Sequence, residues 1–319
     1  MNLLDLCVTL FVDDSDVDKK FEKTGNQAEA LAGKLKNGLA TAAKVGSLAV
    51  SAAATGISVL TKRSIESYGE YEQLVGGVET LFKSSADTVM QYAANAYQTA
   101  GMSANEYMTT VTAFSASLLQ SMGGDTDAAA EKANLAITDM SDNANKMGTD
   151  MELIQNAYRG FAKSNYAMLD NLALGYGGTK EEMERLLADA EKLSGIKYDI
   201  SSYSDIVDAI HVVQTEMGIT GTTAKEASTT IQGSVSAMKS AWENLVTGVA
   251  NGNADIDALI GNLVDSATTA AGNVLPRIEQ ILNGVGAAVS RFAPVLSEQV
   301  PQMLSATLPA LLTSAISLT

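Results

Sequence analysis

The chain has 319 residues and a net charge of -16, because 37 acidic side chains outnumber 21 basic ones. Proteins that bind DNA or RNA directly normally present a cationic surface to the phosphates, so this charge argues against a nucleic-acid partner and is typical of a soluble acidic protein. A single cysteine, Cys7, excludes an intramolecular disulfide framework and a cysteine-rich zinc site.

The first predicted element is a strand at Leu3–Val12, where apolar and β-branched residues dominate. Asp13–Asp16 then supplies candidate caps for a helix. That helix is expected to run on through an alanine-rich segment as far as Tyr71. Residues 1–60 are therefore predicted to form an N-terminal strand and a long alanine-rich helix.

The segment Gly38–Leu60 is apolar, broken only by Lys44, and long enough to span a bilayer. Its small residues recur four apart, a spacing that allows helices to approach closely. Alanine and serine nevertheless make it only weakly hydrophobic. Two interpretations stay open, helix packing in a soluble assembly and contact with a membrane.

Residues 61–250 are predicted to form a compact domain of many helices, and no proline precedes Pro276. Apolar residues recur at helical spacing in three stripes: Tyr107, Val111, Phe114 and Leu118; Ala133, Ile137, Met140, Ala144 and Met147; Met151, Ile154, Tyr158 and Phe161. Such narrow stripes favour helix bundles, coiled coils or oligomers. Capping boxes are predicted at Ser103–Glu106 and Thr179–Glu182. Turns are predicted at Gly101, Gly123-Gly124, Gly148, Gly177-Gly178, Gly195 and Gly218. Gly177 and Gly178 are expected to allow backbone angles that other residues resist.

Residues 251–319 carry few charges and contain all four prolines, which are Pro276, Pro294, Pro301 and Pro309. Apolar stripes at Ile256, Leu259 and Leu263 and from Ile278 to Val289 predict further helices. The apolar end of the chain leads us to expect either that the chain continues in a longer protein or that this end binds a partner or a membrane. The predicted fold class is thus all-α, with elongated helices flanking a compact multi-helix domain.

Short matches to catalytic or metal-binding motifs do not hold together. Elements of the serine β-lactamase set occur at Ser236–Lys239, Ser141–Asn143 and Lys23–Gly25, but in reversed chain order. The start of a calcium-binding loop is matched by Asp14, Asp16 and Asp18. That loop then requires a glycine and a glutamate, but this chain has Lys19 and Gly25 at those two positions.

Isolated reactive side chains have simpler interpretations. Glu181, Glu182 and Glu184 are interpreted as a solvated helix face that supports Arg185, and the single histidine, His211, as a structural residue of a helix. Gly284 and Gly286 follow a predicted helix, whereas a dinucleotide fingerprint follows a strand. The sequence predicts no enzyme, and no catalytic, cofactor-binding or metal-binding residue.

Two stretches of the chain resemble the phage tail tape measure protein family. The longer stretch runs from Ser141 to Met183 and includes Ala157-Tyr158-Arg159-Gly160-Phe161 and Leu174-Gly175-Tyr176-Gly177-Gly178-Thr179. The shorter comprises Thr230–Ser234 and Lys239–Leu245. The blocks are long and in the expected order, and the resemblance extends over about residues 61–294.

The resemblance implies a structural protein that sets the length of the tail tube in a phage or prophage particle. Several copies would lie in the tail interior after synthesis in the host cytoplasm. Its implied partners are tail tube proteins, tail-tip or baseplate proteins, assembly chaperones and further copies of itself. Apolar segments could contact the host envelope during genome delivery. The alternative from the residues is a membrane-active protein, either a pore-former or an envelope-penetrating effector.

Overall fold

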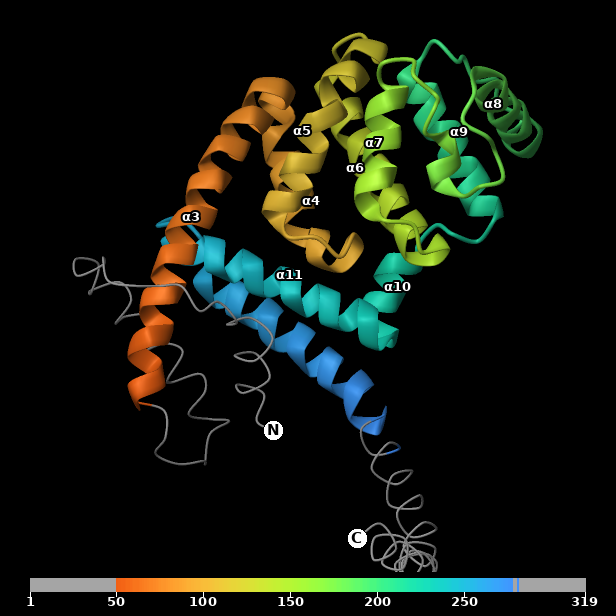
Figure 1. Ribbon diagram of the computed structural model, residues 1–319. Helices are drawn as coiled ribbons and strands as arrows, with labels where there is room; N and C mark the ends of the chain where they lie inside the picture. Colours follow the sequence, from red (N-terminus) through yellow and green to blue (C-terminus); the bar gives the residue numbers. More distant parts are fainter. Residues whose placement is uncertain (1–49, 278–279, 281–319) are drawn as a thin grey trace, which may run out of the picture. The chain divides into compact units, whose positions relative to one another are not determined.

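The computed structural model describes residues 50–277 and residue 280. These residues contain helices and no strand, which confirms the predicted all-α class (Figure 1). The predicted strand Leu3–Val12 lies outside the described residues. The chain divides into two compact units, Met1–Ala270 and Ala271–Thr319, and all the packing described below lies within the first.

The described helices follow one another with short connections. They are α3 (Val50–Phe82), the 3-10 turn η1 (Lys83–Ser85), α4 (Ala86–Thr99), α5 (Ala104–Ser121), α6 (Thr126–Met147), α7 (Met151–Phe161), η2 (Leu169–Leu172), α8 (Lys180–Ser194), α9 (Tyr203–Glu216), α10 (Thr222–Thr229) and α11 (Ile231–Ala250). A further helix spans residues 256–277.

The longest of these helices is α3, with 33 residues. Its described part confirms the predicted passage of an alanine-rich helix through Tyr71, and the helix continues to Phe82. The absence of proline permits this length, because no backbone donor is missing along the segment. It packs against α5 and α11, whereas α4, α5 and α6 stack beside one another (Figure 1).

The predicted apolar stripes form the core. All four residues of the first stripe are buried, as are Ala133, Ile137 and Met140 of the second and Ile154, Tyr158 and Phe161 of the third. Met147 is 36% exposed, because it lies in the last turn of α6 where the helix leaves the core. Four alanines of α6 are fully buried and allow close helix packing: Ala129, Ala130, Ala133 and Ala136.

Most predicted turns contain a glycine in the left-handed region of backbone space. Gly101, Gly123, Gly124, Gly148, Gly195 and Gly218 all have positive φ values. The prediction was wrong for Gly177 and Gly178, which were expected to adopt such angles and do not. The left-handed residues of that loop are Ala173 and Gly175, which lie closer to η2.

The helix at 256–277 packs against α11 through a small apolar cluster of Met238, Ala267 and Ala270, with Val235 and Leu263 at its edge. Gly248 in α11 allows the approach, because a Cβ there would lie 2.2 Å from Cδ1 of Leu259. The predicted domain boundary after Ala250 falls in the loop between these helices. The predicted stripe from Ile278 to Val289 lies outside the described residues.

Candidate functional site

The Ser141-Asp142-Asn143 sequence in α6 contacts two other parts of the fold, the start of α10 and η2. The fully buried Asp142 carboxylate accepts hydrogen bonds from the backbone N–H groups of Gly221, at 2.6 Å, and Thr223, at 2.7 Å. It therefore caps the first turn of α10, whose own N-cap residue, Gly221, has no side chain to do so. The Asn143 amide donates to the Leu172 carbonyl at 2.9 Å and so fixes η2.

The Tyr176–Thr179 turn is held by the first turns of α8. The Thr179 hydroxyl accepts from the Glu182 backbone N–H, which confirms the cap. The predicted capping box is incomplete, because the Thr179 N–H donates to the Gly177 carbonyl and not to Glu182. The Glu182 carboxylate reaches back beyond the cap residue to Gly177 N–H, at 2.9 Å. Gly178 is required for space, since a Cβ there would lie 2.3 Å from the Ala167 carbonyl oxygen.

Arg185 completes this turn. Its guanidinium donates to the Gly175 carbonyl and to Glu182, and it lies 4.4 Å from the centre of the Tyr176 ring. The pKa of Glu182 is lowered, first by the hydrogen bond from Arg185 and then by the one from Gly177. The predicted support of Arg185 by the glutamate face of α8 therefore takes the form of a clamp on the preceding loop.

His211 pairs with a buried carboxylate of α6. Its Nδ1 lies 2.9 Å and 3.0 Å from the two Asp139 oxygens, and only 1% of the Asp139 side chain is exposed. One turn earlier in α9, Asp208 forms an ion pair with Lys132 of α6. The histidine interpreted from sequence as structural thus joins α9 to α6 by a hydrogen bond to a buried carboxylate, which the sequence did not predict.

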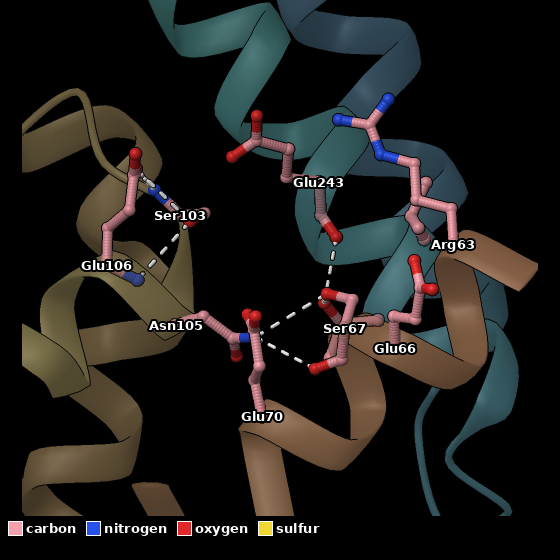
Figure 2. A pocket seen from close by; sticks show the side chains of 10 residues that line it. Arg63, Glu66, Ser67, Glu70, Ser103, Asn105, Glu106 and Glu243 are labelled. Atoms are coloured by element: carbon pink, nitrogen blue, oxygen red, sulfur yellow. Dashed lines mark hydrogen bonds between the residues drawn. The ribbon is translucent and has the colours of Figure 1, made fainter. Parts of the chain in front are cut away.

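A polar pocket of about 290 Å³ lies where α3, the start of α5 and α11 meet (Figure 2). Four glutamates and an arginine stand among its lining residues: Glu66, Glu70, Glu106, Glu243 and Arg63. Other lining residues are joined by hydrogen bonds: the Asn105 amide donates to the Ser67 carbonyl at 2.9 Å, and the Ser67 and Thr247 hydroxyls are hydrogen-bonded.

The pocket also contains the predicted capping box of α5. Ser103 and Glu106 satisfy each other's backbone N–H groups, which confirms that prediction. Asn244 of α11 accepts from the Ala104 N–H at 2.7 Å, so α11 binds the same helix start. Burial and then the neighbouring Glu106 charge raise the pKa of Glu243. The pocket is therefore a place where three helices contact one another and where several acidic side chains gather.

The remaining candidate motifs of the sequence do not converge on one site. Ser236 of the Ser-x-x-Lys match donates to the Gly101 carbonyl at 3.4 Å, beside Ser240, which donates to the same oxygen at 3.0 Å. The Lys23–Gly25 and Asp14–Asp18 matches lie outside the described residues. Within the part of the chain that the structure describes, no group of three acidic, histidine or cysteine side chains could hold a metal ion.

No helix among the described residues combines the length and the apolar character needed to cross a membrane. The part of Gly38–Leu60 that precedes Val50 lies outside those residues. Comparison of the chain with protein-family models, with curated proteins and with solved structures finds no match.

Proposed function

We propose that this chain is a structural tail tape measure protein, which sets the length of a phage or prophage tail tube during assembly. The observation that carries the proposal is the ordered resemblance of Ser141–Met183 and Thr230–Leu245 to that family. In the fold, these blocks contain Asp142 and Asn143, which connect α6 to α10 and to η2, and Gly178, which lets its loop approach Ala167 closely.

The helical character of the chain supports a ruler mechanism. An α-helix rises about 1.5 Å per residue, so a helical segment converts residue number directly into length. The described part begins with the 33-residue helix α3 and ends in the helix at 256–277. The compact arrangement of α4 to α11 between them covers less length per residue than a single extended helix would.

The partners that follow from this proposal are further copies of the chain, the tail tube protein, tail-tip or baseplate proteins and assembly chaperones. The chain would be made in the host cytoplasm and enclosed in the tail of the virion. Apolar segments would reach the host envelope only during genome delivery. The net charge of -16 is consistent with partners other than nucleic acid.

The proposal is tested by whether purified tails protect the chain from protease. Tail particles from a producing strain are treated with protease before and after the tube is opened with denaturant, and the chain is followed by mass spectrometry. We expect it to copurify with intact tails and to be cleaved only after opening. Absence from tails, or cleavage in intact tails whose tube protein survives, would contradict the proposal.

The membrane-active alternative predicts a different result. A pore-forming or envelope-penetrating chain would bind liposomes without any tail present. Its basis in the sequence is the apolar segment Gly38–Leu60 together with the apolar end of the chain, and no helix among the described residues is long and apolar enough to cross a membrane. Liposome flotation of the purified full chain measures this directly.

A further inference from the structure

The α8–α9 hairpin lies at the edge of the helical domain. Helix α8 packs against α9, whereas α9 also packs against α5 and α6 (Figure 1). The buried side chains of α8 are Met183, Leu186, Leu187 and Ala190, and this apolar face holds the two helices of the hairpin together. The attachment of the hairpin to the rest of the domain therefore runs through α9, at its seams with α6 and with α5.

The seam between α9 and α6 is unusual because it contains charged groups beside apolar ones. Lys132 and Asp139, two turns apart on α6, pair with Asp208 and His211, one turn apart on α9. Gln214, which lies one turn after His211 on α9, is fully buried. These charged pairs are partly withdrawn from water and so contribute less to stability than apolar packing of similar volume, because their groups lose hydration.

The two members of the His211–Asp139 pair differ in their access to solvent. Asp139 is 1% exposed, while 30% of the His211 side chain is exposed. A proton can thus reach the imidazole directly from water, although the carboxylate that benefits from the positive charge is enclosed. Loss of that proton leaves a buried carboxylate facing a neutral ring.

The charges around the pair favour proton binding in the folded state. The hydrogen bond to Asp139 is the main reason that the pKa of His211 is raised, with Asp208 adding to it and burial and Lys132 opposing it. Burial is the main reason that the pKa of Asp139 is raised, and Asp142 and Asp208 add to it. Burial raises the pKa of Tyr158 in α7, and the nearby Asp139 charge raises the pKa of Tyr158 further.

The two raised pKa values determine how the stability of the fold changes with pH. A histidine whose pKa is higher in the folded than in the unfolded chain stabilises the fold fully below its unfolded pKa, about 6.5, and this contribution disappears as pH rises through the folded pKa. A raised Asp139 pKa acts in the same direction, because it makes the folded state bind protons more tightly. The seam is therefore strongest in mild acid.

We propose that the His211–Asp139 pair is a proton-controlled clasp that holds the α8–α9 hairpin on α6 while the imidazole is charged and allows the hairpin to open when it is neutral. The clasp is independent of the tail function proposed above, because it depends only on the packing of this domain. Opening would expose the inner face of α9, whose buried residues include Ile206, Val207 and Ile210.

Hydrogen exchange of the full chain, followed by mass spectrometry, tests the clasp when it is compared at about pH 5.5, which is below the ordinary histidine pKa, and at about pH 8.5, which is about two units above it. After correction for intrinsic exchange, peptides from α8 and α9 are expected to lose protection at the higher pH. The loss is about tenfold for each unit by which folding raises the histidine pKa. Peptides from α4 and α5 should keep theirs.

Two variants isolate the charged pair. His211→Gln and Asp139→Asn each remove one titrating partner at nearly constant volume, and either should abolish the pH response of the hairpin. Lys192→Gln breaks the exposed Lys192–Asp189 pair of α8 and should leave the response unchanged.

Three results would overturn the proposal: hairpin protection that is constant with pH in the unmodified chain, an unchanged response in a folded His211→Gln or Asp139→Asn variant, or a parallel loss of protection in α4 and α5. The first and third require no variant, so the proposal remains falsifiable even if neither substitution folds.

Discussion

At the scale of single residues, polar side chains far apart in the sequence fix how the helices meet. Asp142 is 79 residues from Gly221, yet its carboxylate receives the first free N–H groups of α10. A helix of eight residues is marginal by itself, so an external cap of this kind determines whether and where it forms.

Removing that cap is expected to destabilise the domain. Asp142→Ala leaves the backbone donors of Gly221 and Thr223, which are only partly buried, without their acceptor and should lower the free energy of unfolding by about 1–3 kcal/mol. Asp142→Asn, which keeps one acceptor oxygen, should cost less. Urea unfolding followed by circular dichroism measures both, with the exposed Asp257→Ala as control. Equal stability of Asp142→Ala and the control would contradict the role assigned to this carboxylate.

Substitution by alanine is expected to have opposite effects on stability at two glycines. Gly178→Ala places a Cβ against the Ala167 carbonyl oxygen and should destabilise the fold by roughly 1–3 kcal/mol, as overpacking does. Gly76→Ala in α3 meets nothing within 4 Å and should stabilise the helix by roughly 0.5–1 kcal/mol. Thermal unfolding of the two variants measures the contrast, and shifts in the same direction would show that the loop contact is not as close as described.

At the scale of helices and turns, local signals in the sequence were informative. The repeating apolar spacing of α5 identified four buried residues, and the Ser103–Glu106 pattern located the start of that helix. Both depend on residues three or four apart, which a helix necessarily brings together. The position of Thr179 at the start of α8 was found in the same way.

Contacts between distant segments left no comparable signal. Nothing near Asn244 indicates that its side chain accepts from Ala104, and Lys132 and Asp208 are unremarkable surface residues until α6 and α9 are packed together. The need for Gly178 was expected from backbone angles but arises from the nearness of Ala167, which lies across the loop. The polar pocket of Figure 2 could not be predicted for the same reason, because three separate helices form it.

The capping box of α5 gives a prediction at this scale. Ser103→Ala removes the acceptor for the Glu106 N–H and should lower the free energy of unfolding by about 1 kcal/mol. Because the same turn contacts α11 through Asn244, Asn244→Ala should add a loss of similar size. Denaturant unfolding of the single and double variants measures both. The exposed Thr268→Ala, whose hydroxyl bonds only within its own helix, should change little.

At the scale of the whole molecule, the proposed function makes length the essential variable. Each residue added to a long helix lengthens that helix by about 1.5 Å, while a folded domain such as α4–α11 adds a fixed length. Insertions in helical segments are therefore the cleanest change, provided that they preserve the helical phase and leave the packing of α11 intact. The position after Gly272 satisfies both conditions, since the residues that contact Met238 end at Ala270.

The most direct test is the length of the tails made with an insertion of about 36 helical residues after Gly272, which is ten turns. Electron microscopy should show tails about 54 Å longer than those of the unmodified chain. A variant of unchanged length, Val264→Ser, serves as control and should give tails of the original length, because Val264 is an exposed side chain. Tails of unchanged length with the insertion, in particles that contain the full-length inserted chain, would contradict the ruler function.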